Sequence, residues 1–280
     1  MNVWQRGTSA VTMSDGYYNV DRFRGEENTS GSATWSRSTS VPDNTDFPYS
    51  LQVDCTGTDT SLASSDKCVL QHTIEAQNIA KHTKWGTSNA EKLTLSFWVK
   101  SNQTGQHSVG LTSSGGAINE DNGDGLQIFW GLTTGSGYQG TADTWTQTNE
   151  GAIAVSGDVN FLSSTDNNFY ITGVQMEVGE QATPFEHRSI GDELARCQRY
   201  YYYGEQSKWL FDLANSNSYR RGVEFWAVTM RAAPSVTITF SGTPGDSRGV
   251  QHISDHHCNI YVDNESSYAF YTIIAADAEL

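Results

Sequence analysis

Basic residues are scarce in this chain. Its 280 residues include 17 Lys and Arg against 32 Asp and Glu, so the formal net charge at pH 7 is -15. A chain with this excess of negative charge repels the phosphate backbone of DNA and RNA. We therefore expect no nucleic acid among its partners.

Long apolar runs are also missing. No stretch approaches the roughly 20 apolar residues that a helix needs to span a bilayer. The opening segment, from Met1 to Gly7, does not have the pattern of a signal peptide. We expect no membrane insertion, and we expect synthesis in a cytoplasm that such a protein leaves only by cell lysis.

Cysteine and proline are rare, at four and five residues, and no two cysteines form a Cys-x-x-Cys pair. Cys55 and Cys68 flank a polar loop, where they could form a disulfide after release or stay as free buried thiols. What is abundant instead is Gly, Ser, Thr and Asn, together with 11% aromatic and only 18% charged residues. This mixture indicates an all-β protein with many turns, long enough for one large or two modest domains.

Alternating apolar and polar residues predict the strands. The clearest strand is 93–100, with one face made of Leu93, Leu95, Phe97 and Val99 and the other of Thr94, Ser96, Trp98 and Lys100. Residues 126–132 repeat the alternation, and shorter candidates lie at 17–23 and 33–37. Many short strands at turn-bounded intervals predict a β-sandwich of the jelly-roll type.

The stretch from Phe169 to Tyr203 marks a junction. Its alternation slips by one residue at Gly173, which indicates a β-bulge, and Pro184 ends the strand. Ser189 with Asp192 three residues later is typical of a helix start. The predicted helix carries one stripe, made of Ile190, Leu194, Cys197 and Tyr201.

A second, smaller β region follows this helix. Its strand candidates are 221–231, 236–240, 249–254, 259–262 and 268–275. The region contains Trp209, Phe211, Phe225, Trp226, Phe270 and Tyr271. A small domain cannot easily bury so many aromatic rings, so we expect them partly to line an interface between copies of the chain.

Several segments resemble bacteriophage tail-fibre and other virion proteins. The stretch from Gln175 to Tyr201 is similar to a junction in which a carbohydrate-binding-module-like jelly roll ends and a segment with Cys-Gln-Arg-Tyr-Tyr leads to a terminal domain. Further matching segments are Val3–Gly7 with Asp21–Phe23, Leu93–Lys100, and the closing Val-Thr-Met-Arg-Ala-Ala-Pro and Ala-Asp-Ala-Glu-Leu motifs. The resemblance covers nearly the whole chain.

The resemblance implies a jelly-roll β-sandwich over residues 1–188 with an N-terminal arm, a helical linker over 189–204 and a small β tip over 205–280. It also implies a non-enzymatic tail fibre, spike or head fibre on the outside of the virion. Such a protein would be a homotrimer that contacts other virion proteins and attaches to a glycan on the host surface. Two alternatives stay open: a capsid decoration protein that binds no glycan, and a polysaccharide depolymerase or glycosidase.

The predicted glycan-binding face is the polar side of the strand at 93–100. Many sugar-binding jelly rolls stack a pyranose ring on an aromatic side chain of this kind, and Trp98 stands there among Thr94, Ser96 and Lys100. Alternatively, loops or a neighbouring subunit cover this face and bury the ring. Two further candidates, Tyr138 and Trp145, lie in loop-like stretches.

The sequence contains candidates for two further kinds of site. Asp121, Asn122 and Asp124 lie in a glycine-bearing acidic loop, which is a candidate structural Ca²⁺ site or simply a solvated turn; we expect no other cofactor. Neither a nucleophile elbow nor a zinc-protease helix is present. Glu177 and Glu186 could form a glycosidase pair, but an acidic chain offers many such pairs, and we expect no catalytic residues.

Overall fold

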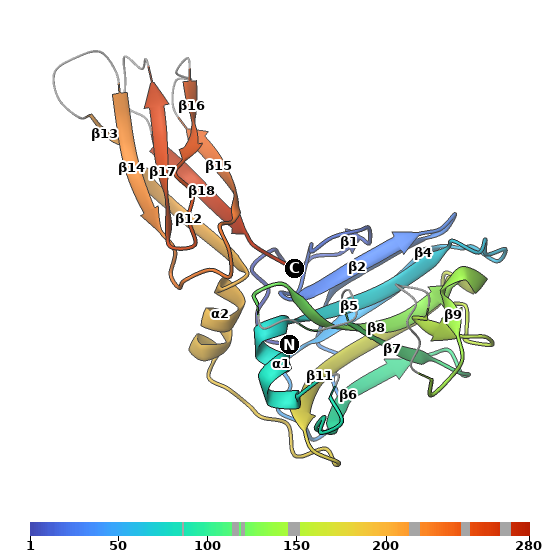
Figure 1. The fold of residues 1–280 in the computed structure, drawn as a ribbon. Helices are drawn as coiled ribbons and strands as arrows, with labels where there is room; N and C mark the ends of the chain where they lie inside the picture. The colour runs from blue at the N-terminus through green and yellow to red at the C-terminus, as the bar shows by residue number, and fades with distance from the viewer. Residues whose placement is uncertain are drawn as a thin grey trace. The chain divides into compact units, whose positions relative to one another are not determined.

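The computed structural model contains two compact units (Figure 1). It describes residues 1–85, 87–113, 118, 121–144, 152–212, 219–241, 247–263 and 270–280. The first unit comprises Met1–His187 together with Leu280, and the second comprises Arg188–Glu279. Strands dominate both units, which confirms the predicted all-β class. No helix within the described ranges is long and apolar enough to cross a membrane.

The first unit is a sandwich of two antiparallel sheets. Sheet I has the strand order β1 (Val11–Thr12), β3 (Ser32–Ser38), β4 (Ser50–Gly57), β11 (Asn168–Val178) and β6 (Leu93–Ser101). Sheet II has the order β2 (Phe23–Asn28), β5 (Lys67–Glu75), β8 (Asp124–Thr134) and β7 (Ser108–Ser113). The chain passes repeatedly between the two sheets (Figure 1). The more specific jelly-roll type stays a prediction.

One core lies between sheets I and II. The alternation in β8 directs Leu126, Ile128, Trp130 and Leu132 inward, as the sequence predicts, and the facing strands contribute Trp35, Leu51, Val53, Phe169 and Ile171. All nine side chains are buried. Burial of apolar area on this scale is the main term that stabilises a sandwich.

The unit also contains short elements that belong to neither sheet I nor sheet II. They are α1 (Ala76–Thr83), η1 (Ser136–Tyr138), β9 (Gln139–Gly140), β10 (Ala154–Val155) and η2 (Phe161–Ser163). Helix α1 was not predicted, because it is only eight residues long and buries just two apolar side chains, Ala76 and Ile79, beside the polar Thr83. The strand predicted at 17–23 is wrong: Arg22 has φ 72°, so a strand begins only at Phe23. The N-terminal segment packs on the body through Met13 and Val20.

The junction forms largely as predicted. Strand β11 has its irregularity between Thr172 and Gln175, and Gly173 has φ 60°, which confirms the bulge. Helix α2 (Ile190–Gln198) begins after Ser189, whose side chain accepts a hydrogen bond from the Asp192 amide. The predicted extension of the helical stripe to Tyr201 is wrong. That residue begins strand β12, where the run of tyrosines suits β structure.

The second unit contains two smaller sheets. Sheet III has the order β12 (Tyr201–Trp209), β18 (Phe270–Asp277) and β15 (Ser235–Ser241). Sheet IV has the order β13 (Phe211–Asp212), β14 (Tyr219–Phe225), β17 (His257–Asp263) and β16 (Ser247–Gln251). A separate core is formed by Tyr202, Leu210, Trp226, Met230, Cys258, Ile260, Val262, Ile274, Ala276 and Ala278.

The strand predicted at 221–231 is too long at its end. Strand β14 stops at Phe225, because the Trp226 amide donates to His256 O at 3.0 Å and the Met230 amide donates to Asp255 O at 2.8 Å. These bonds hold the chain in a turn that buries Trp226 and Met230. The side chains of Trp209, Phe211, Phe270 and Tyr271 lie outside what the structure describes.

Candidate functional site

Strand register builds a polar surface on the outer face of sheet I. Since Val53 and Phe169 point into the core, their neighbours Gln52 and Tyr170 point outward. The pairing places Ser36 opposite Gln52, Gln52 opposite Tyr170 and Tyr170 opposite Lys100. With Asp54 and Trp98, these side chains form what we call the outer platform: Ser36, Gln52, Asp54, Trp98, Lys100 and Tyr170.

Trp98 is the most exposed aromatic side chain of this platform. It is 51% exposed, whereas its neighbour Phe97 packs inward with its ring 5.7 Å from that of Trp130. A Cβ atom placed on Gly173 would lie 3.0 Å from Trp98 Cδ1, so the indole rests beside the bulge of β11. The face is therefore open at Trp98, and an apolar ring is available to solvent.

Polar side chains surround the aromatic rings of the outer platform. Gln52 Nε2 donates to both carboxylate oxygens of Asp54, at 2.9 and 2.7 Å. Lys100 Nζ lies 5.2 Å from the centre of the Tyr170 ring and donates to Ser40 Oγ at 3.0 Å. Burial, with a smaller contribution from the negative charge of Asp54, raises the pKa of Tyr170 above its usual value. Its hydroxyl therefore stays protonated and can donate a hydrogen bond at neutral pH.

The segment that follows β11 folds back against this sheet. The amide and hydroxyl of Thr183 donate to Glu177 at 2.7 and 2.6 Å. Phe185 then packs on Phe47, with ring centres 5.0 Å apart, and His187 lies 5.6 Å from the same ring. A structural role thus accounts for the Ala-Thr-Pro-Phe-Glu motif, which holds the fold-back segment against Glu177, Gln175 and Phe47.

The predicted face divides at the bulge. Trp98 and Lys100 lie on the part that adjoins Tyr170, while Ser96 pairs with Gln175 on the other side of the bulge. Thr94 lies further along, and its hydroxyl donates to Gly179 O at 2.8 Å. The latter two predicted residues are thus placed near the fold-back segment rather than beside the exposed tryptophan.

Tyr138 lies on the opposite side of the sandwich. It packs with Val69, Phe129 and Ile153 on the outer face of sheet II, and Lys67 Nζ lies 5.0 Å from its ring centre. It cannot share a binding site with Trp98, because the whole sandwich separates them. Trp145 lies outside the described residues.

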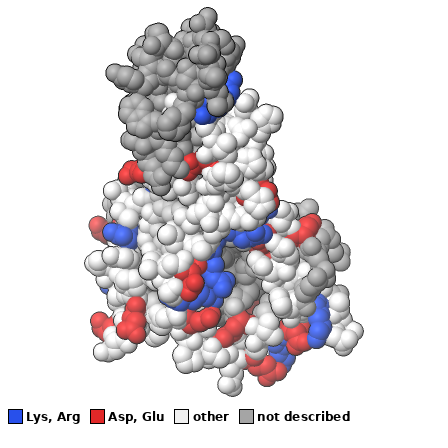
Figure 2. All heavy atoms as spheres, turned by 90° about the vertical axis from the view of Figure 1, so that its left-hand side faces the viewer, with Lys and Arg blue, Asp and Glu red and all other residues white. Residues whose placement is uncertain are grey.

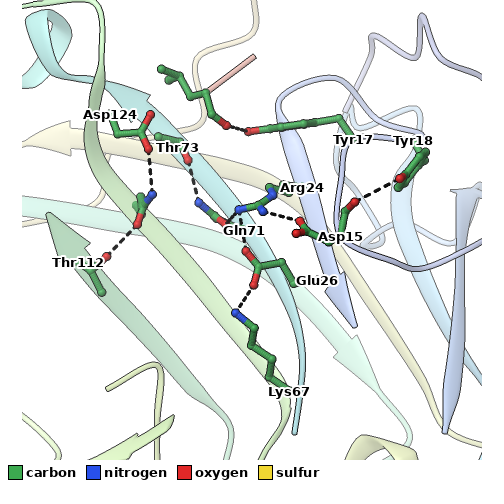
Figure 3. Close-up of polar contacts among 12 residues, drawn as sticks. Asp15, Tyr17, Tyr18, Arg24, Glu26, Lys67, Gln71, Thr73, Thr112 and Asp124 are labelled. Atoms are coloured by element: carbon green, nitrogen blue, oxygen red, sulfur yellow. Dashed lines mark hydrogen bonds and ion pairs between the residues drawn. The ribbon is translucent and has the colours of Figure 1, made fainter. Parts of the chain in front are cut away.

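The outer face of sheet II carries its own polar network (Figure 3). Glu26 accepts from Lys67 and, at 2.7 Å, from Arg24, which also pairs with Asp15. Arg24 donates further to Gln71 at 3.1 Å. These charges satisfy one another, so this network is explained by packing and ion pairing.

On the face drawn in Figure 2, most described side chains are uncharged, and basic and acidic groups lie close together.

The predicted calcium loop precedes β8. Asp121 Oδ1 accepts from the Gly123 amide at 2.9 Å. Asp124, labelled in Figure 3, accepts a hydrogen bond from Gln127 through Oδ2 at 3.2 Å. Asn122 is exposed in the same loop. The described residues contain no group of three His, Cys, Asp or Glu arranged to hold a metal ion. A calcium ion at this loop stays a prediction.

Hydrogen bonds favour the ionised form of Glu177. Two hydrogen bonds from Thr183 lower the pKa of Glu177, and the one from the hydroxyl has a larger effect than the one from the amide. A general acid needs a raised pKa, so this carboxylate is unsuited to protonate a leaving group. Glu186 follows in the fold-back segment, where its amide donates to Gln175 Oε1 at 2.8 Å.

Sequence reasoning missed four members of the outer platform: Ser36, Gln52, Asp54 and Tyr170. The last three each stand between buried residues of a strand and therefore point outward. The alternation of buried and outward-facing residues in these strands was visible in the sequence, but the pairing of β4 with β11 was not. Comparison of the chain with protein-family models, with curated proteins and with solved structures gave no match.

Proposed function

We propose that this protein is a non-catalytic structural component of a bacteriophage virion that binds a host surface glycan on the outer platform. The observation that carries the binding proposal is the half-exposed Trp98 on a polar sheet face beside Tyr170. The virion assignment, as a tail fibre, spike or head fibre, is supported by the sequence resemblance. The platform belongs to the first unit, and its strands form its rigid base.

The chemistry of the platform suits a sugar. A pyranose ring presents C–H groups that pack on the flat face of an indole, while its hydroxyls require donors and acceptors around the rim. Lys100 and the Tyr170 hydroxyl supply donors, and Asp54 supplies acceptors. Their charges are few and of both signs, which favours a neutral or weakly charged saccharide over a polyanion.

Substitution of the exposed tryptophan tests the binding proposal. Trp98→Ala should weaken binding to an array of bacterial surface polysaccharides by at least about tenfold, equivalent to about 1.4 kcal/mol. Because the ring is half-exposed and the core side of β6 is untouched, thermal stability should change by no more than about 0.5 kcal/mol. The matched control is Tyr18→Ala, which removes another exposed ring (44% exposed) from the same unit.

The outcomes distinguish the alternatives. Unchanged binding by the Trp98→Ala protein would overturn the platform proposal. If the unsubstituted protein binds no polysaccharide on the array, the capsid decoration alternative gains support. Sustained release of reducing ends from the same polysaccharides at catalytic protein concentrations would contradict the non-catalytic assignment.

A further inference from the structure

The second unit has an open groove along one side, lined by both apolar and polar residues. A cavity of about 480 Å³ is lined by residues of β15 and β16. These two strands, labelled in Figure 1, are edge strands of sheets III and IV. Val236, Ile238, Phe240 and Val250 line the cavity. These four side chains pack against the buried core but are themselves only partly buried. Water therefore reaches apolar groups that belong to the core of this unit.

Apolar side chains protrude elsewhere on the same unit. Phe225 is 69% exposed and Val223 is 51% exposed, and both lie on the outward face of β14. Between them, Glu224 is buried. We call these two exposed side chains, Val223 and Phe225, the knob. Exposure of both to water is unfavourable, and exposed apolar patches of this kind mark interaction sites.

Charges of opposite sign accompany the groove and the knob. Arg248 lies at the groove, with its guanidinium 5.4 Å from the Phe240 ring centre, and within the described residues no carboxylate pairs with it. Asp255 lies near the knob, since it stands two residues before His257, whose ring is 5.8 Å from that of Phe225. The carboxylate of Asp255 lies 3.7 Å from His256 Nε2.

We propose that the groove receives the knob of a second copy of this chain. Phe225 and Val223 of one copy occupy the cavity between β15 and β16 of the next, and Asp255 of the first faces Arg248 of the second. The volume suffices for both side chains, and the charges match. Because the knob lies on the outer face of sheet IV and the groove at its β16 edge, the contact is heterologous. Repetition of such a contact joins copies head to tail, and gives a ring where the rotation between copies closes.

Cysteine cross-linking between differently tagged copies tests the contact directly. The native cysteines are all buried, so they should not interfere. When Phe225→Cys protein is mixed with Val236→Cys protein and mildly oxidised, a disulfide-linked heterodimer should form. The control pairs Val236→Cys with Val178→Cys, a residue that is 53% exposed in the first unit, and should give no such product. Equal yields from the two mixtures would overturn the proposal.

Sedimentation equilibrium of the full chain provides an independent test. We expect an oligomer at micromolar concentration, and Phe225→Asp should reduce its mass to that of a monomer while Val178→Asp should not. Arg248→Glu should also dissociate the oligomer, and the Arg248→Glu/Asp255→Arg double variant should restore it. A monomeric unsubstituted chain, or a double variant that stays monomeric, would contradict the interface. Neither result depends on whether a glycan binds.

Discussion

The stability of this fold depends on pH through the protonation of one side chain, His72. His72 is half-buried on β5, where its Nδ1 lies 3.0 Å from Arg22 O. Burial and the nearby Arg22 charge lower the pKa of His72 below its usual value of about 6.5, against the smaller opposing effect of that hydrogen bond. Above pH 6.5 the imidazole is neutral in both states and its stability contribution is complete. As the pH falls below 6.5, the unfolded chain binds a proton that the folded chain excludes, so stability decreases by up to about 1.4 kcal/mol per pH unit.

Chemical denaturation between pH 7.5 and pH 5 measures this effect, because most carboxylates stay ionised in that range. The His72→Gln variant has no titrating ring and should show a shallower pH dependence than the unsubstituted protein. The contribution of the other histidines is present in both proteins and cancels in the comparison. Identical slopes would show that His72 does not control acid stability.

A single glycine allows strand β11 to carry the outer platform. Gly173 has φ 60°, and a Cβ atom there would lie 2.5 Å from Phe47 Cζ and 3.0 Å from Trp98 Cδ1. Gly173→Ala should therefore destabilise the protein by about 2 kcal/mol, through left-handed strain and displacement of both rings. Since the indole must move, glycan binding should weaken as well. Denaturant titration and binding to the polysaccharide array measure the two effects.

Gly157→Ala is the matched control for this element. Gly157 has φ 93°, but a Cβ atom at that position would meet nothing within 4 Å. The Gly157→Ala protein should therefore lose stability through backbone strain alone, and its glycan binding should be unchanged. If both alanine variants bind equally well, the bulge does not position Trp98.

The two units have separate cores, so we expect each unit to unfold with its own free energy. Leu51 is fully buried in the first unit and Ile260 in the second. Either residue replaced by alanine should cost about 2–5 kcal/mol, through lost burial and the cavity that remains. Calorimetry should resolve two transitions, with Leu51→Ala lowering only one and Ile260→Ala lowering only the other. A single transition that moves with both variants would show instead that the units unfold cooperatively.

Individual strands were predictable because their apolar residues alternate. The pattern of 126–132 reappears as the inward face of β8, and the slip at Gly173 reappears as the bulge of β11. The errors occur where tertiary contacts compete with local preference. Trp226 continues the alternation of β14 in sequence, yet bonds to the turn at residues 254–257 remove it from the strand.

Local sequence patterns were sufficient to predict the all-β class, the polar outward face of β6 and the helix start at Ser189, because each depends on side-chain parity or on groups a few residues apart. The order of the strands, in contrast, depends on tertiary contacts. Pairing of β11 with both β4 and β6 brings Gln52, Tyr170 and Lys100 into one row, although up to 118 positions separate them along the chain. It also left Tyr138 on the other sheet and opened a groove between β15 and β16. Such contacts arise from burial shared by distant segments, and no local pattern encodes them.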